Sequence, residues 1–246
     1  MSIGSNADWR GLRGAADAAR ETLRALEAAV RSGITTGALD RVAAGVFAAH
    51  GARSAPATVY GFPGTVLISI NDEVVHGVPG NRALRMGDVV KLDVTVEKDG
   101  YVADAARTVI VGVGTVVAQR LRASAESAFR AAIRVATVGA RVSSIGRAVE
   151  ADVKRAGFSV VRGLAGHGVG RTIHEPPNVP NFFDPGQNDV LTDGLVLAIE
   201  PMVTVGSGEV VESLDGWTIR TRDGGLAAHY ENTVVITTRG PVVLTA

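Results

Sequence analysis

Four carboxylates lie inside or beside apolar, strand-like runs of this chain. Asp93 is part of VVKLDVTV, Asp104 is part of YVADAARTVI, Glu200 follows LVLAI and Glu231 precedes NTVVIT. Runs of β-branched residues such as these are typical of buried strands. A carboxylate removed from water must be paired, protonated or bound to a metal ion. Any fold that buries these strands must therefore also compensate four acids.

Few cations are available in the sequence to neutralise these acids. Arg107 and Arg171 are the obvious candidates, and two guanidinium groups do not balance four carboxylates. Two divalent ions would balance them. His167, between Gly166 and Gly168, adds an imidazole, and glycines permit a close backbone approach. Manganese, iron, cobalt and zinc all suit such donors, so the sequence predicts a dinuclear metal hydrolase with the metal left open.

A hairpin is predicted between the first two acids. The turn EKDG separates their two strands, and its Asp99-Gly100 pair is typical of a tight β-hairpin. A hairpin brings the residues on either side of its turn alongside each other. We therefore expect Asp93 and Asp104 to face one pair of ions.

Helices are predicted before each group of strands. Apolar residues near the N-terminus recur at alternating steps of four and three, which makes one apolar stripe. These residues are Leu12, Ala16, Ala19, Leu23, Leu26 and Val30. Gly33 is the expected terminator of this helix, and Thr36 the expected cap of a second one. A third helix is expected over residues 116–138, and a fourth is expected to begin at Ser143.

The order of long helix, glycine turn, capped helix and strands occurs twice. It divides the chain into halves at about residues 8–113 and 116–240, and Asp104 then corresponds to Glu231. Any two halves that mix helices and strands look somewhat alike, and this alternative stays open. The repeat favours one catalytic domain over residues 1–246, of α+β class, with a pseudo-twofold antiparallel sheet backed by four helices.

Five short motifs give the sequence a specific resemblance. NDEVVHGVP, GHGVGR, HEPP, IEPM and YENT occur in this order between about Gly33 and the C-terminus. Each motif is moderately specific, and their order and spacing together are very specific. The chain resembles the type I methionine aminopeptidases of the pita-bread metallopeptidase family. The resemblance implies the pita-bread fold and removal of an N-terminal methionine by a hydroxide that bridges two divalent metals.

The resemblance also implies a ligand set. In that family the equivalents of Asp93, Asp104, His167, Glu200 and Glu231 bind two divalent ions. Asp104 and Glu231 would bridge them, Asp93 would complete one ion, and His167 with Glu200 would complete the other. Cobalt, manganese, iron and zinc remain equally compatible with these donors.

Further residues are expected to act on the substrate. By resemblance, His76 and His174 contact the peptide, and together with Glu200 they form the expected catalytic set. An imidazole can donate a hydrogen bond to an oxyanion or protonate a leaving amine. Each of these histidines, taken alone, is equally well explained as part of a structural turn. The residues that match the wall of the methionine slot are Phe62, Ile173 and Trp217.

The sequence departs from the family pattern at several positions. Pro56, Val59 and Leu67 stand where many members have cysteine or tyrosine, and Ala198 replaces a common threonine. The replacements at Val59 and Leu67 predict a more tolerant methionine slot. His229, two residues before Glu231, matches no motif that we can use, and we interpret it as peripheral.

Composition narrows the classes of partner. The formal net charge is zero, so no basic field indicates nucleic acid, and the absence of cysteine excludes disulfides and thiolate zinc sites. No apolar run of signal-peptide or membrane-spanning type is found. We therefore expect a cytoplasmic protein without a membrane partner. The resemblance implies a chain that acts as a monomer on N-terminal peptides of nascent proteins, with the ribosome as a further expected partner.

Two other functions compete with methionine removal. One is another aminopeptidase of the same fold, such as a proline-directed enzyme, although those usually carry an additional N-terminal domain. The other is a non-catalytic binding homologue, which is expected to have lost metal ligands. All five expected ligands are present in this sequence.

Overall fold

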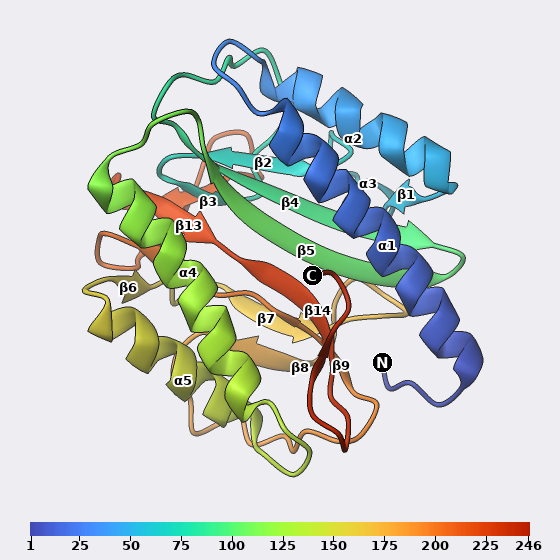
Figure 1. Cartoon of the computed structure of the whole chain (residues 1–246). Coiled ribbons are helices and arrows are strands. Elements are labelled where there is room, and N and C mark those ends of the chain that lie inside the picture. The colour runs from blue at the N-terminus through green and yellow to red at the C-terminus, as the bar shows by residue number, and fades with distance from the viewer.

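The centre of the computed structural model, which describes residues 1–246, is a nine-stranded sheet in which every pairing is antiparallel. Its strands are β1 (Arg53–Ser54), β2 (Leu67–Ile70), β4 (Val89–Lys98), β5 (Tyr101–Ile110), β7 (Ala165–Gly168), β8 (Glu175–Pro180), β9 (Val196–Ile199), β14 (Glu231–Val235) and β15 (Val242–Val243). The main order is β1-β4-β5-β14-β9-β7-β8, with β2 beside β4 and β15 beside β14. Strands from both halves of the chain, β5 and β14, thus pair in the middle of one sheet (Figure 1).

The predicted hairpin is confirmed as β4 and β5. Asp99 and Gly100 have φ values of 53° and 79°, the pair of positive values that a two-residue type I′ turn requires. Thr95 of β4 lies opposite Asp104 of β5 in the register, and Asp93 lies two residues before Thr95 in β4. Because side chains alternate between faces along a strand, both aspartates point to the same side of the sheet.

Four long helices cover one face of the sheet (Figure 1). They are α1 (Asn6–Ala29), α2 (Thr36–His50), α4 (Val116–Val135) and α5 (Val142–Arg155), and the short α3 (Ala55–Tyr60) precedes β2. α1 packs on β4, β5 and α2, whereas α4 packs on α5, which reaches β8. The expected four helices are therefore present, with α3 as one short helix that the sequence did not predict.

Two helix ends differ from the prediction. α1 ends at Ala29, and Val30 already has an extended backbone, so the apolar stripe stops one residue early. Gly33 has a positive φ of 87° but lies beyond the helix and does not terminate it. α4 ends at Val135, three residues before the predicted end, in line with the lower precision of helix ends.

The predicted caps are also shifted. Thr35, not Thr36, caps α2, since the Thr35 hydroxyl accepts a hydrogen bond from Ala38 N at 3.1 Å. Arg141 precedes α5 and makes no side-chain cap, while Ser143 lies inside the first turn. A cap residue needs an extended backbone, and the two predicted caps, Thr36 and Ser143, are already helical.

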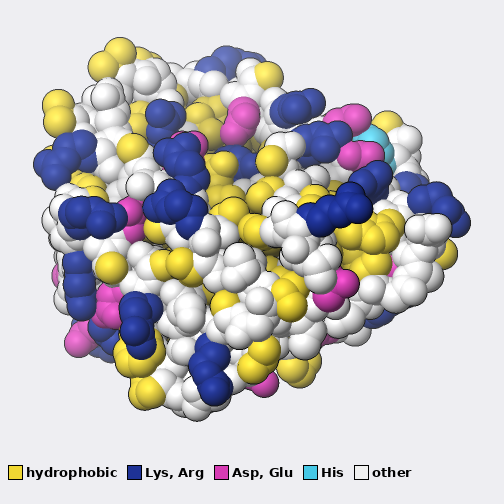
Figure 2. All heavy atoms as spheres, turned by 60° about the horizontal axis from the view of Figure 1, so that its bottom comes forward, with side chains coloured by type: hydrophobic (Ala, Val, Ile, Leu, Met, Phe, Trp, Pro, Cys, Tyr) yellow, Lys and Arg dark blue, Asp and Glu magenta, His cyan; other side chains and the backbone are white.

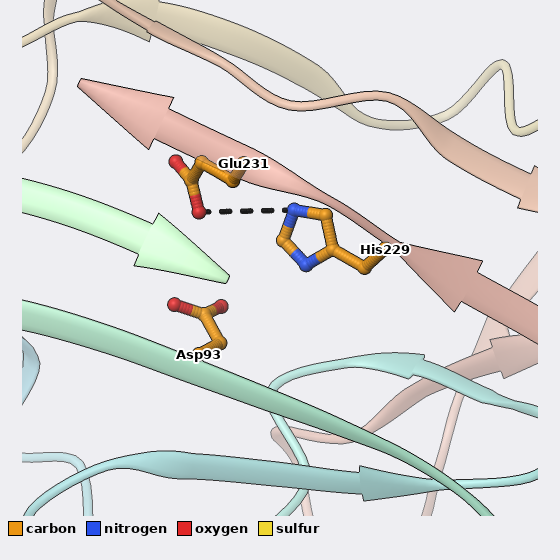
Figure 3. Close-up of side chains that lie close together, drawn as sticks. All are labelled: Asp93, His229 and Glu231. Carbon is orange, nitrogen blue, oxygen red and sulfur yellow. Dashed lines mark ion pairs between the residues drawn. The ribbon is translucent and has the colours of Figure 1, made fainter. Parts of the chain in front are cut away.

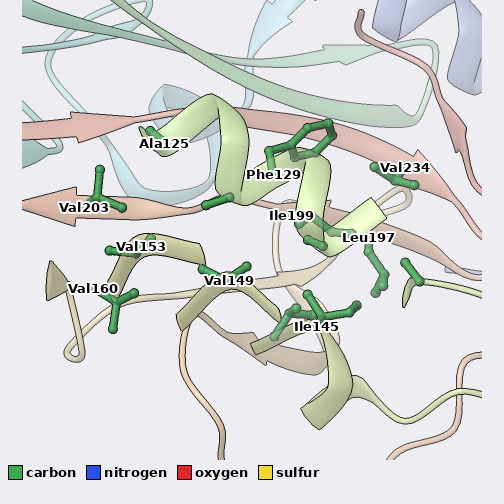
Figure 4. Packing of buried hydrophobic residues seen from close by; sticks show 14 of the residues in the cluster. Ala125, Phe129, Ile145, Val149, Val153, Val160, Leu197, Ile199, Val203 and Val234 are labelled. Carbon is green, nitrogen blue, oxygen red and sulfur yellow. The ribbon is translucent and has the colours of Figure 1, made fainter. Parts of the chain in front are cut away.

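The helix-facing side of the sheet is apolar. A cluster of 19 buried hydrophobic residues joins α4 and α5 to β9 and β14. Figure 4 shows Phe129 of α4, Val149 of α5 and Leu197 of β9 within this cluster. Each such side chain contributes about 1.5–3 kcal/mol on burial. A second cluster, of 17 residues, joins α1 and α2 to β2, β4 and β5.

Two small sheets lie beside the large one. One is formed by β13 (Ala227–His229), β10 (Met202–Thr204) and β6 (Ser159–Val160), and the other by β11 (Val210–Glu212), β12 (Ile219–Thr221) and β3 (Glu73–Val75). The second sheet pairs β3 with β12 and so brings His76 near Trp217. No helix of the chain is long and apolar enough to cross a membrane.

Candidate metal centre

The four acids come from the four central strands, on the side that no long helix covers. Asp93 and Asp104 lie on β4 and β5, Glu200 directly follows β9, and Glu231 is the first residue of β14. Glu231 lies opposite Ala106 in the register, next to the two aspartates. Strands more than a hundred residues apart in the chain thus place their acids around one cleft. The cleft is lined by Asp93, Asp104, Glu200 and Glu231, among others.

These carboxylates are poorly compensated. Asp104 accepts a hydrogen bond from Thr95 Oγ1 at 2.9 Å, whereas Asp93 Oδ1 and Glu231 Oε1 are shielded from solvent and have no partner. Burial raises the pKa of Asp104 to about 6. Burial and the neighbouring acids raise the pKa values of Asp93, Glu200 and Glu231 well above their usual range. Without a cation, this group therefore holds protons.

Neither candidate arginine forms an ion pair with these acids. Arg107 donates to the backbone oxygen of Glu231 at 2.6 Å, and its guanidinium stacks on the ring of Tyr230. Arg171 pairs with Asp8 at 2.7 Å, outside the cleft. The shortage of cations predicted from the sequence is therefore present in the structure.

Two groups of donors satisfy the geometry of a metal site. Asp104, His167 and Glu231 form one, and Asp93, His229 and Glu231 form the other, with all donor atoms of each group within 4.8 Å of one another. Glu231 belongs to both groups, as a residue shared by two ions must. Figure 3 shows the carboxylates of Asp93 and Glu231 pointing toward each other and toward the ring of His229. The donor set fits two divalent ions better than a network of ion pairs.

His167 has the orientation of a ligand. Its Nδ1 is 2.9 Å from Gly168 O, a distance at which Nδ1–H donates, and this leaves Nε2 with its lone pair free. Nε2 lies 3.4 Å from Glu200 Oε1. Burial lowers the pKa of the ring, which favours the neutral form that binds metals. The flanking Gly166 and Gly168 are required, because a Cβ there would meet backbone oxygens of neighbouring strands.

His229 is not peripheral, and that interpretation was wrong. The residue is fully buried, and its Nε2 lies 3.6 Å from Glu200 Oε2 and 3.7 Å from Glu231 Oε2. Burial lowers the pKa of this ring to about 3, so it is neutral. Residues two apart in extended chain share a face, which places His229 on the side of Glu231. The two-residue separation from Glu231 was the feature of the sequence that could have placed His229 at the centre.

His76 and His174 lie at the open part of the cleft. The rings of His174 and His167 are 4.3 Å apart, and Tyr60 Oη lies 2.6 Å from His174 Nδ1. Loss of water lowers the pKa of both His76 and His174. His76 has a positive φ of 60° and accepts a hydrogen bond from Thr218 Oγ1 at 3.4 Å through its backbone oxygen. The contact of Tyr60 was missed because no motif contains this residue.

An apolar slot adjoins the acids in the same cleft. Phe62 and Trp217 meet edge to face with ring centroids 5.3 Å apart, and Ile173 lies nearby in the lining. The remaining apolar walls, of which only the first two were named individually in the sequence analysis, are Pro56, Leu67, Val75, Leu164, Ala165 and Met202. Aromatic and branched walls suit a flexible, apolar side chain.

The positions that depart from the family pattern have different surroundings. Pro56 and Leu67 line the cleft, whereas Val59 is 56% exposed and lies outside the lining. Ala198 is fully buried within β9, opposite His167 in the register. The expected effect on the slot can therefore come from Pro56 and Leu67, and not from Val59.

Comparison with known proteins identifies relatives over nearly the whole chain. The model of metallopeptidase family M24 matches residues 10–238. A methionine aminopeptidase of Clostridium perfringens is 47% identical over 225 residues, which cover 92% of this chain and 90% of the relative. The methionine aminopeptidase of Escherichia coli K12 is 39% identical over 247 residues, which cover 100% of this chain and 94% of the relative.

Solved structures agree with the fold. The methionine aminopeptidase of Thermotoga maritima superposes with a TM-score of 0.96 at 34% identity, covering 100% of this chain and 99% of that one. A prolidase of Pyrococcus furiosus has a TM-score of 0.81 at 20% identity, and the match covers 99% of this chain but only 65% of that longer chain. The predicted pita-bread architecture is confirmed by these neighbours.

The fold and the cleft, with acids and imidazoles converging beside an apolar slot, define a metal-dependent hydrolase. The chain belongs to metallopeptidase family M24. Membership implies divalent metal cofactors, and the donor groups around Glu231 are suited to hold them.

Proposed function

We propose that this chain is a methionyl aminopeptidase that removes the N-terminal methionine of newly made proteins when the next residue is small. The observation that carries this proposal is one cleft in which buried acids and imidazoles adjoin an apolar slot. Polar groups at one end of an apolar pocket are what a hydrolase with a hydrophobic specificity needs. The names of relatives at 47% and 39% identity support the same activity.

Two divalent ions would be held by Asp93, Asp104, His167, Glu200 and Glu231. The place of Glu231 in both donor groups supports its role as a shared ligand, and Asp104 lies beside it on the neighbouring strand. When bound, such ions polarise a carbonyl group and lower the pKa of water toward neutrality. Mixed oxygen and nitrogen donors leave cobalt, manganese, iron and zinc open.

Proton transfer is assigned to Glu200. Hydrolysis needs a base that takes a proton from the attacking water and returns it to the leaving amine as the carbon–nitrogen bond breaks. Glu200 lies at the cleft, and its carboxylate is not tied up by an arginine or a lysine. Its position beside His167 and His229 supports this role.

His174 would donate a hydrogen bond to the developing oxyanion. Its Nδ1 is engaged by Tyr60, so Nε2 is the nitrogen left to face the peptide. Such a donor, held in place before the reaction, stabilises charge that forms only in the transition state. His76, on the turn that follows β3, would contact the amide beyond the scissile bond.

The slot would select the methionine side chain. Phe62, Ile173 and Trp217 form its proposed walls, and a thioether is well suited to aromatic contacts. The turn after His76 would leave little room for a long side chain in the next residue of the substrate. We therefore propose that glycine, alanine or serine is preferred there.

The alternatives are less well supported. A proline-directed enzyme would match the prolidase neighbour, but that similarity is at 20% identity and concerns the fold alone. A binding homologue without activity would have no need of a complete donor set, and this chain retains all five expected ligands.

One assay separates these functions. The metal-loaded chain should cleave a Met-Ala-Ser peptide and not an Ala-Pro peptide, and a chelator should abolish the cleavage. Preference for the Ala-Pro peptide would support the proline-directed alternative. No cleavage of either peptide by protein that has bound metal would support the binding homologue.

The proposed substrates are newly made proteins, which emerge from ribosomes. We therefore propose that the chain works in the cytoplasm, near ribosomes. Although the net charge of the whole chain is zero, residues 116–162, which include α4 and α5, carry nine basic and three acidic side chains. Figure 2 shows several Lys and Arg side chains on the side of the molecule where these helices lie. Such a surface would attract an anionic partner. Salt-sensitive co-sedimentation with ribosomes tests this part of the proposal.

We further propose that the chain is a single domain and acts as a monomer. All proposed ligands and slot walls come from one chain. Each half, at about residues 8–113 and 116–240, supplies a strand pair with two acids, β4–β5 in one and β9–β14 in the other, and β5 pairs with β14 between them. One cooperative unfolding transition and a monomeric mass in light scattering are the expected results.

A further inference from the structure

His229 is a buried titratable side chain at the centre, and the family resemblance gives it no function. It ends β13, two residues before Glu231, and has no exposed surface. Thr108 Oγ1 accepts a hydrogen bond from His229 N at 2.9 Å and donates to His229 O at 2.8 Å. These two bonds fix the backbone of His229 to β5. They do not involve the ring.

The ring itself has no hydrogen bond. Both Nδ1 and Nε2 of His229 are buried and lack a partner. Buried polar atoms in proteins are nearly always satisfied, so an unpartnered ring aimed at acids requires an explanation. A ligand that fills the space between the ring and the acids would satisfy Nε2.

The distances match shared coordination better than hydrogen bonding. Nε2 lies 3.7 Å from Glu231 Oε2, well beyond the hydrogen-bond range of about 2.7–3.2 Å. Two donors about 2.1 Å from one ion lie about 3.0–4.2 Å apart, for angles between 90° and 180° at the ion. Asp93 contributes the third donor, which lies within 4.8 Å of the other two and points toward them (Figure 3).

We propose that His229 is an additional metal ligand, which binds through Nε2 the ion that Asp93 and Glu231 hold. This inference rests on the proposed metallopeptidase function, since it adds a donor to the same centre. Each of the two ions would then have one imidazole, His167 on one and His229 on the other. The second imidazole would shift the Asp93 side of the centre away from magnesium and toward iron, cobalt or zinc.

The decisive variant is His229→Gln, compared with His229→Ala. Glutamine keeps the ability to hydrogen-bond to a carboxylate but is a poor ligand for these metals, whereas alanine has neither property. Cobalt binding to the metal-free proteins is measured by isothermal titration calorimetry. We expect both variants to lose at least about 10- to 100-fold in affinity at one of two sites, the loss that even an indirect partner of a ligand causes. The other site should be affected much less.

Two outcomes would overturn the assignment. Wild-type affinity at both sites in the two variants would show that His229 does not touch an ion. Retention in His229→Gln but loss in His229→Ala would make His229 a positioning residue that acts through a hydrogen bond. His50→Gln is the matched control, because His50 lies at the end of α2 and pairs with Glu21 on the surface.

The wild-type protein provides a test that does not depend on the folding of a variant. X-ray absorption of the protein loaded with two cobalt ions counts imidazole ligands, and we expect two imidazoles for the two ions. One imidazole would contradict the inference about His229 and leave the proposed function intact. A wild-type chain that binds no divalent ion and cleaves no Met-Ala-Ser peptide would instead contradict the proposed function.

Discussion

The two faces of β4 differ in what they contribute. Leu92 and Val94 point to the helices, are fully buried, and belong to an apolar cluster of 17 residues. Asp93 and Thr95, which alternate with them, point into the cleft, where Thr95 donates to Asp104. A strand with this pattern serves packing on one side and chemistry on the other.

The difference shows where stability comes from and where it is lost. Apolar burial on the helix side stabilises the fold, whereas acids with raised pKa values on the cleft side oppose it until cations bind. Sites arranged for chemistry are often locally unfavourable, and the surrounding structure must hold them. Substitutions on the two faces should therefore separate activity from stability.

The largest effect is expected from the shared ligands. Asp104→Ala or Glu231→Ala would leave both ions short of a donor, and activity should fall more than about 1000-fold, because metal ions supply several kcal/mol of transition-state stabilisation. The metal-free variants should be as stable as the metal-free wild type or more so, since a buried acid has been removed. Glu126→Ala, at a surface pair with Arg130, is the control. Full activity with two bound ions would refute the proposed centre.

On the helix face the reverse is expected. Leu92→Ala removes a fully buried side chain next to Asp93 and should lower the free energy of unfolding by about 2–5 kcal/mol. The folded fraction should keep its specific activity and its metal content. Urea unfolding followed by assays on folded protein measures both quantities. A loss of activity with little loss of stability would mean that the two faces are not separable.

Much of this arrangement was predictable from local sequence. The Asp99-Gly100 turn and the β-branched runs predicted the hairpin, and the apolar stripe predicted α1, because these signals act over a few residues. The contact of Tyr60 with His174 joins residues 114 positions apart, and no local pattern encodes it. The interpretation of His229 as peripheral was different, because its two-residue separation from Glu231 is a local feature and was sufficient to place both side chains on one face.

On the cleft face, replacement of His174 should lower turnover without changing metal binding. His174→Ala should reduce kcat by about 10- to 1000-fold if the ring donates to the oxyanion. Metal content should not change, because Tyr60 engages His174 Nδ1 and His174 is not among the proposed ligands. Tyr60→Phe should give a smaller decrease, since it removes only the bond to Nδ1. Loss of metal in parallel with activity would reassign His174 as a ligand.

Removing the metal should make stability depend on pH in a specific direction. The acids have raised pKa values in the folded state, so the folded chain binds protons more tightly than the unfolded chain does. The stabilisation is complete below the unfolded pKa of about 4, and for Asp104 it is lost as pH rises through about 6. The slope is at most about 1.4 kcal/mol per pH unit for each group.

Thermal unfolding of the metal-free chain across this pH range measures the effect. The metal-loaded chain should lack the decrease, because its acids are then compensated by cations. Glu231→Gln should reduce the decrease in the metal-free chain, since one titrating group is gone. The buried histidines of the cleft have lowered pKa values and contribute in the opposite direction, so the comparison with Glu231→Gln isolates the effect of the acid. The same dependence on pH between 4 and 6 in the metal-free wild type and in Glu231→Gln would contradict the uncompensated state of the cleft.

The smallest effect is expected in the apolar part of the cleft. Pro56 and Leu67, two of the positions expected to depart from the family pattern, line the cleft. Selection by one or two methylene-sized groups is worth only about 1–3 kcal/mol, so a peptide that begins with norleucine should compete with methionine. Ratios of kcat/KM for norleucine-Ala-Ser and Met-Ala-Ser peptides measure this. A preference for methionine above about 1000-fold would exceed that limit and require a polar contact to the thioether sulfur.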